Sequence, residues 1–276
     1  MRLHAFSFCA LALALLVGSV TAHAEATLVV MEDNTKHQFT TTELLARSDS
    51  KAVTVQTDLS PQPFTYRAVP LLALIGGGVG QHFDTLEARA LDGFVSQIPL
   101  ALIARGANRG AVAWIAVEDP THPWPPLPLK TGTPGPFYLI WEHPERSGVT
   151  TEQWPYKLAS LTFAESPIHR WPQLALPASV PSDAPARRGQ AVFLTQCLPC
   201  HRLNGGGAGE VGPDLGRPMS PTDYLTDAGL RAIIRNTRAV RTWPGQQMAV
   251  FSKTNLPDTD LDAVVAYLYA MAGKPR

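Results

Sequence analysis

The pattern of hydrophobic and polar positions divides this chain of 276 residues into two parts. In the first part, short segments are continuously apolar or alternate with a period of two, which is typical of β-strands. Two further segments, Thr42 to Ala46 and Val69 to Ile75, have the spacing of short helices. The predicted strands are Thr27 to Met31, Ala52 to Gln56, Leu86 to Ala90, Ala113 to Val117 and Pro136 to Trp141. We therefore expect residues 25–172 to form a strand-rich α+β domain.

In the second part, apolar residues recur at helical spacing. The pattern predicts helices over Ala186 to Gln196, over about Thr226 to Thr237, and from about Asp258 onwards. Asp258 is the first of three aspartates in or beside the first turn of the last helix, where carboxylates complement the helix dipole. We expect residues 185–276 to form an all-α domain.

A proline-rich segment, residues 173–184, separates the two parts. It contains Pro177 and Pro181 among small residues, and it has no amphipathic period. Such a composition favours an extended and fairly stiff chain. We expect this segment to be a linker, since a chain of this length is comfortable for two domains.

The first 24 residues have the organisation of a secretory signal peptide. A basic lead that includes Arg2 precedes an apolar run from Ala5 to Val17, and Ala22-His23-Ala24 is a small-x-small cleavage signal. The apolar run has 13 residues, fewer than the roughly 20 that span a bilayer. We expect cleavage after Ala24, a periplasmic mature protein, and no stable membrane insertion after cleavage.

Charge excludes one class of partner. The formal net charge is +0 at pH 7, so the chain is not a general binder of polyanions, and we expect no nucleic-acid partner. The charges are unevenly placed, because residues 185–276 contain eleven Lys and Arg against seven Asp and Glu. This surplus would steer the C-terminal domain towards an acidic partner surface.

The most specific chemical signal is Cys197-Leu198-Pro199-Cys200-His201, a C-x-x-C-H motif at the end of a predicted helix. Two thiols on one helical turn can each form a thioether with one vinyl group of the same porphyrin. The adjacent His201 can then reach the iron as proximal ligand. A bare C-x-x-C would also suit a redox dithiol or half of a zinc site, but the histidine favours a c-type haem. Signal cleavage would remove Cys9 and leave these two thiols as the only ones.

Beyond this motif, residues 186–273 resemble a class I monohaem cytochrome c. The resemblance also rests on the turn Gly212-Pro213-Asp214-Leu215, a late methionine, and the final segment Val264-Val265-Ala266-Tyr267-Leu268. It implies the all-α cytochrome c fold and one covalent haem c. It further implies that the carbonyl of Pro213 accepts a hydrogen bond from the proximal imidazole and so fixes the ring. The alternative is an ordinary turn proline.

The sixth iron ligand is sought among the methionines. The resemblance places it in the loop between the second and last helices, where Met248 lies. Met219 follows His201 by only eighteen residues and would need a tight return, and a haem without a methionine ligand is the third alternative. A thioether would raise the potential and close the iron to exogenous ligands. The predicted haem-binding residues are Cys197, Cys200, His201, Pro213 and Met248, with His201 and Met248 on the iron.

Arg231, Arg235 and Arg238 share one face of the second predicted C-terminal helix, and Arg241 lies just beyond it. One interpretation is a solvated helix face. The other is a basic docking patch for a redox partner, where charge complementarity sets the rate of encounter more than the affinity.

Several short pieces of the N-terminal domain resemble the sulfite-oxidase-type molybdopterin-binding fold. They are Phe39 with Leu45, residues 66–74, Ala90 to Phe94, Gly135 to Ile140, and Trp154 to Leu158. Enzymes of that type bind molybdenum through a cysteine thiolate. Residues 25–172 contain no cysteine, and the position where we expect one reads Thr57-Asp58-Leu59. Because that soft anionic ligand is missing, we expect no bound molybdopterin and a non-catalytic domain. The glycine run 76–80 lacks the Lys-Ser/Thr pair of a phosphate loop.

Three functions compete on these observations. The first is a periplasmic electron-transfer protein with one His/Met-ligated haem. Its N-terminal domain would serve for docking or as a scaffold, and its partner would be a donor dehydrogenase or an acceptor oxidase or cytochrome. The alternative is an oxidoreductase in which the N-terminal domain oxidises a small substrate and passes electrons to the haem. The third is a gas sensor with an open haem.

Overall fold

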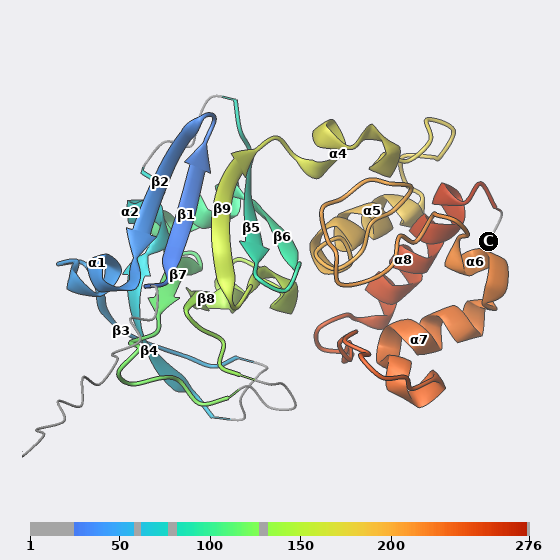
Figure 1. The fold of residues 1–276 in the computed structure, drawn as a ribbon. Helices are drawn as coiled ribbons and strands as arrows, with labels where there is room; N and C mark the ends of the chain where they lie inside the picture. The colour runs from blue at the N-terminus through green and yellow to red at the C-terminus, as the bar shows by residue number, and fades with distance from the viewer. Residues whose placement is uncertain (1–24, 58–61, 77–81, 127–131, 275–276) are drawn as a thin grey trace, which may run out of the picture.

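The computed structural model describes residues 25–57, 62–76, 82–126 and 132–274. The predicted signal peptide, Asp58 and Leu59 at the expected molybdenum-ligand position, and residues 77–80 of the glycine run lie outside these ranges. The described chain forms a strand-rich N-terminal part and a helical C-terminal part (Figure 1). Both classes of secondary structure that the sequence predicts are therefore confirmed.

The described residues of the N-terminal part form two β-sheets. The five-stranded sheet has the order β2-β1-β9-β5-β6. Its strands are β1 (Thr27–Glu32), β2 (Thr35–Thr40), β5 (Thr85–Ala90), β6 (Val95–Pro99) and β9 (Leu158–Ala164). Neighbours are antiparallel except β1 and β9, which are parallel. Strand β6 is an edge strand, on the side that faces the helical part (Figure 1).

The four-stranded sheet is antiparallel throughout, with the order β3-β4-β7-β8. Its strands are β3 (Lys51–Val55), β4 (Phe64–Pro70), β7 (Val112–Val117) and β8 (Phe137–Glu142). Short helices connect the strands of both sheets: α1 (Thr41–Ala46), α2 (Leu71–Leu74) and α3 (Leu100–Ala104), followed by a 3-10 turn at Arg105–Asn108. Helix α1 begins at a capping box, in which Thr40 and Glu43 satisfy each other's backbone N–H groups.

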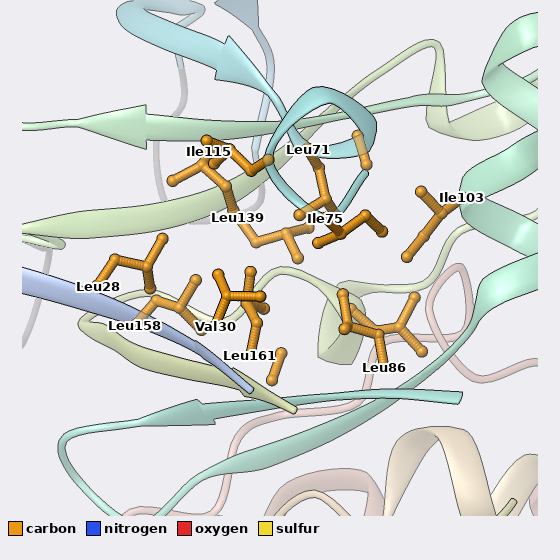
Figure 2. Close-up of a cluster of buried hydrophobic side chains, with 14 of the residues drawn as sticks. Leu28, Val30, Leu71, Ile75, Leu86, Ile103, Ile115, Leu139, Leu158 and Leu161 are labelled. Carbon is orange, nitrogen blue, oxygen red and sulfur yellow. The ribbon is translucent and has the colours of Figure 1, made fainter. Parts of the chain in front are cut away.

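One hydrophobic core joins the two sheets (Figure 2). Leu28 of β1, Leu86 of β5 and Leu161 of β9 lie fully buried on one side, and Ile115 and Leu139 from the second sheet are equally buried. Helices α2 and α3 add Leu71 and Ile103 to the same cluster, as Figure 2 shows. The burial of apolar area here is what holds the N-terminal part together.

The five predicted strands are confirmed, each within one residue of the observed ends. Strands β2, β4, β6 and β9 were not predicted. The residues of β2 are largely exposed, so its sequence carries no apolar alternation. The helix predicted from Val69 begins only at Leu71, because Val69 and Pro70 complete strand β4 and pair with β7.

The C-terminal part consists of four helices within the described residues. They are α5 (Pro185–Gln196), α6 (Pro221–Tyr224), α7 (Asp227–Val240) and α8 (Asp258–Met271). The three predicted helices are confirmed as α5, α7 and α8, and α6 is an additional single turn. Within the described ranges, no helix combines the length and the apolar character that crossing a bilayer requires.

Helices α5 and α8 cross in close contact. A Cβ atom at Gly189 would overlap the backbone carbonyl of Ala263, so only glycine permits this approach of the two helices. One turn further along, the rings of Phe193 and Tyr267 lie 5.2 Å apart, and both side chains are fully buried. This crossing fixes the direction in which α5 delivers the residues that follow it.

Within the segment predicted as an extended linker, residues 173–184, most residues are exposed, but Leu174 and Leu176 are buried against the C-terminal part. The segment follows helix α4 (Pro167–Arg170) and begins within a 3-10 turn (Pro172–Leu174). Leu174 is fully buried in the C-terminal core. Its carbonyl accepts hydrogen bonds from Tyr267 Oη at 2.7 Å and Gln190 Nε2 at 2.8 Å. Leucine at two positions gives this segment apolar surface to bury, which its proline content did not reveal.

Candidate haem-attachment site

The C-x-x-C-H motif forms a tight turn at the end of α5. The N–H of Cys197 still donates to the carbonyl of Phe193, at 2.9 Å, and the N–H of His201 donates to the carbonyl of Cys197, also at 2.9 Å. Cys200 donates to the same Cys197 carbonyl at 3.1 Å. The two thiols are not joined by a disulfide. The turn therefore presents two thiols and one imidazole within five consecutive residues, as the sequence pattern requires.

His201 is held by the turn that follows it in sequence. Its Nδ1–H donates to the backbone carbonyl of Pro213 at 2.8 Å, so the structure contains the hydrogen bond that the resemblance implies. Gly212 lies directly against the ring: a Cβ atom there would be 2.6 Å from Nδ1 and 2.9 Å from Nε2. Burial lowers the pKa of His201, and the bond to Pro213 opposes this only in part. The imidazole is therefore kept neutral with Nε2 available, which is the form that binds a metal.

Asp214 holds this turn in place, a role that the sequence reading missed. Its carboxylate accepts hydrogen bonds from four backbone N–H groups: Asn204 at 3.0 Å, Gly205 at 2.7 Å, Gly216 at 2.7 Å and Arg217 at 3.1 Å. These amides come from both arms of the loop that carries Pro213. The signal that could have revealed it is the aspartate inside Gly212-Pro213-Asp214-Leu215, since Asp commonly accepts from nearby backbone N–H groups in turns.

The C-terminal segment that contains these features matches a known family. Residues 186–272 match the family model described as Cytochrome c. This part of the chain is similar to a cytochrome c domain, and we refer to it as the cytochrome c domain. A comparison with curated proteins found no match. The family implies covalently bound haem c and a haem-based electron-transfer role, and the two thiols and the neutral imidazole of this turn are the groups that such an attachment requires.

Met248 lies in the loop between α7 and α8 of the cytochrome c domain. Its side chain is half-buried and packs against the domain core. In the same loop, the Nε2 of Gln246 is buried and has no acceptor among the described residues, which fits a site that a further polar group completes. Met219, the alternative ligand, is 53% exposed and lines a hollow of about 240 Å³ with Leu215 and Leu268.

Arg235 anchors the far end of the Met248 loop. Its Nη1 donates to the backbone carbonyls of Phe251 at 3.1 Å, Ser252 at 3.3 Å and Leu256, and its Nη2 pairs with Asp258 at 2.7 Å. In return, the N–H of Phe251 donates to the carbonyl of Arg235 at 3.1 Å. One guanidinium therefore ties α7 to the loop and to the start of α8.

Arg231, one turn earlier, pairs with Asp227 at 2.6 Å and also with Asp262 of α8. Arg231 and Arg235 thus form ion pairs with carboxylates of the cytochrome c domain. Arg238 and Arg241 are exposed, and Arg241 lies over the ring of Trp243 with 5.9 Å between its guanidinium carbon and the ring centroid. Of the predicted arginine face, this end is exposed, whereas Arg231 and Arg235 are half-buried and paired with carboxylates.

The cysteine turn also contacts the N-terminal part, which the sequence did not suggest. The N–H of Val95 in β6 donates to the carbonyl of Pro199 at 2.9 Å, and the N–H of Glu210 donates to the carbonyl of Gly93 at 3.0 Å. Burial, together with the nearby Glu152 carboxylate, raises the pKa of Cys197 to about 12. The haem-attachment turn is therefore covered on one side by a different part of the chain.

Proposed function

We propose that this protein is an exported carrier of single electrons. One haem c would be attached through Cys197 and Cys200, with His201 and Met248 on the iron. The observation that carries the proposal is the C-x-x-C-H turn at the end of α5, with the His201–Pro213 hydrogen bond, inside a cytochrome c domain. A donor dehydrogenase would supply the electron, and an oxidase or a second cytochrome would accept it.

The residues of the site have separable tasks in this function. Bound there, haem c would supply a centre that is reversibly oxidised and reduced by one electron. Pro213 keeps the proton on Nδ1 of His201, so that Nε2 remains a ligand, and it raises the basicity of the imidazole. Asp214 holds Pro213 in place. The thioether of Met248 would favour the ferrous state and exclude exogenous ligands.

The attachment itself is tested by producing the full chain in a host that matures c-type cytochromes. We expect an absorbing protein whose mass includes one haem that resists extraction by acid acetone. The variants Cys197→Ser and Cys200→Ser should each lose one thioether. A colourless mature protein, or one that carries zinc on these thiols, would overturn the proposal.

The distal ligand is tested by Met248→Ala, with Met219→Ala as the matched control. The weak far-red ferric absorption of a sulfur-to-iron bond should disappear in the first variant and persist in the second. The reverse result assigns the role to Met219. Rapid carbon monoxide binding by the unaltered ferrous protein would instead favour the gas sensor.

We propose a periplasmic location, supported by the predicted signal peptide and by the requirement that c-type haem be attached outside the cytoplasm. Sequencing of the mature N-terminus should begin at Glu25. A full-length product retained in the cytoplasm, with Met1 intact, would contradict this.

The contact between β6 and the cysteine turn favours one alternative, an oxidoreductase whose N-terminal domain passes electrons to the haem. The resemblance of that domain to the sulfite-oxidase-type fold belongs to the same proposal. Metal and pterin analysis of the purified protein separates the two functions. Iron alone, at one per chain, supports the carrier with a docking or scaffold domain, and stoichiometric molybdenum supports the enzyme.

A further inference from the structure

We infer that the turn between β5 and β6 of the N-terminal domain is a positioning element of the haem site, through which the state of that domain is coupled to the potential of the haem. The inference rests on the proposed function for the presence of haem. It assigns to the N-terminal domain a role beyond docking, namely holding the loop that carries the proximal ligand.

Two backbone hydrogen bonds bracket the proximal residues. The N–H of Val95 donates to the carbonyl of Pro199 at 2.9 Å, and Pro199 lies two residues before His201. The N–H of Glu210, two residues before Gly212, donates to the carbonyl of Gly93 at 3.0 Å. Just after the second point, the N–H of Gly212 donates to the carbonyl of Cys200 at 2.8 Å. The turn between β5 and β6, with the first residue of β6, thus contacts the chain just before His201 and again just before Gly212 and Pro213, which set the orientation of the imidazole.

That turn is itself held by hydrogen bonds to its own strands and to Lys157. Ala90 donates to the carbonyl of Phe94 at 2.8 Å, and Leu91 donates to the carbonyl of Lys157 at 2.9 Å. The Oδ1 of Asp92 accepts from the N–H of Phe94 at 3.3 Å. A displacement of the N-terminal sheet would therefore be transmitted to the cysteine turn rather than absorbed between them.

The approach is also sterically close. Gly93 has a φ of +87°, which favours glycine, and a Cβ atom there would lie 3.1 Å from the Cβ of Glu210. Beside it, Ser96 donates to the carbonyl of Glu152 at 2.9 Å and holds that residue against β6. The start of β6 (Figure 1) and the turn before it thus bring one main-chain donor, one main-chain acceptor and a close steric contact to one side of the site, and the Glu152 carboxylate lies near Cys197.

Such a contact implies reciprocity. If the orientation of the N-terminal domain changes the free energy of one haem oxidation state, a change of oxidation state must change that orientation by the same free energy. A partner that binds the N-terminal domain would then shift the potential without touching the haem.

The test compares Gly93→Ala with Gly132→Ala in the full haem-loaded chain. Gly132 has a φ of +88°, so the backbone cost of alanine is matched, but a Cβ atom there meets only the flexible Nζ of Lys157, at 3.9 Å. Redox titration should show a shifted midpoint potential for Gly93→Ala and none for Gly132→Ala. Exchange of the backbone amides of Val95 and Glu210 should be about fivefold faster in Gly93→Ala, as expected when one backbone hydrogen bond is lost.

Two further variants separate the contact from strain. Gly93→Ala combined with Glu210→Gly, which removes the opposing Cβ, should restore the potential relative to Glu210→Gly alone. Glu210→Pro deletes the N–H that donates to Gly93 and leaves the N-terminal domain unaltered. If Gly93→Ala does not yield folded protein, the potential and amide exchange of Glu210→Pro test the inference instead. Unchanged potential and exchange in Gly93→Ala, or in Glu210→Pro where that variant decides, overturn the inference. Absence of haem from the unaltered chain overturns the proposed function and with it the coupling to a potential, whereas faster amide exchange in Gly93→Ala would still show that the turn holds the loop.

Discussion

Gly212 lies against the imidazole of His201, so closely that a Cβ atom would be 2.6 Å from Nδ1 and 2.9 Å from Nε2. The neighbouring residue, Pro213, accepts the Nδ1 proton at 2.8 Å. The ring is thus positioned on one side by the lack of a side chain and on the other by a carbonyl. Both features depend on the same turn, and Asp214 holds that turn through four backbone N–H groups.

We predict that Gly212→Ala displaces the ring of His201 and breaks the bond to Pro213. The cost in the free energy of unfolding should be about 1–3 kcal/mol, the range for a buried polar group that loses its partner. Chemical denaturation of the full chain measures this. The haem-loaded variant should also show an altered midpoint potential, and a potential equal to that of the unaltered protein would contradict the positioning role.

Arg235→Met should loosen the Met248 loop, because the variant keeps the aliphatic stem but loses every donor to the loop carbonyls. We expect a loss of about 2–3 kcal/mol in unfolding free energy, as for charge-assisted hydrogen bonds, and a weakened far-red absorption. Arg231→Met is the control, since it removes ion pairs on the same helix that do not reach the loop. Equal effects of the two variants on the absorption would show that loop anchoring is irrelevant to the iron.

We predict that the buried hydroxyl of Tyr66 causes a loss of stability at high pH. Burial raises its pKa to about 12, whereas its ordinary value is 10.0. Above pH 10 the unfolded chain releases this proton and the folded chain keeps it, so the free energy of unfolding falls by about 1.4 kcal/mol per pH unit until about pH 12. In Tyr66→Phe the free energy of unfolding, measured from denaturation curves between pH 10 and pH 12, should fall less steeply with pH. Tyr224→Phe, which removes an exposed hydroxyl, should follow the unaltered protein.

Glu152→Gln should raise the midpoint potential of the haem. The carboxylate lies close enough to the Cys197 sulfur to raise the pKa of that thiol, so its negative charge also stabilises the more positive ferric state. Redox titration at low and high ionic strength checks this, and the difference between the proteins should shrink as salt screens the charge. A lower potential in the variant would contradict the sign of this effect.

The cytochrome c domain was largely readable from sequence because its signals are local. Helix α8 begins at Asp258, as its acidic first turn indicates, and the spacing of Cys197, Cys200 and His201 is itself the chemical requirement. The helix period also predicted one face for Arg231 and Arg235. It could not predict the ion pairs with Asp262 and Asp258, because these two carboxylates belong to another helix.

The contacts that escaped prediction are made by backbone atoms far apart in sequence. The N–H of Val95 donates to the carbonyl of Pro199. Every residue has a backbone carbonyl and every residue except proline has a backbone N–H, so no residue type identifies such a pair in the sequence. The packing of Leu174 is similar, since its carbonyl rather than its side chain receives the bonds from Gln190 and Tyr267. Composition identified the proline-rich stretch but not the burial of Leu174 and Leu176 within it.

The position of β6 at the margin of its sheet has a consequence for dividing this protein. A strand at a sheet margin has unpaired N–H and carbonyl groups that another chain can bind. In β6 one of these groups, the N–H of Val95, is bonded to the cysteine turn. Cutting the chain near residue 172 would uncover it. The N-terminal fragment should then self-associate through the exposed edge of β6. The cytochrome c domain would thus also protect the N-terminal domain against aggregation.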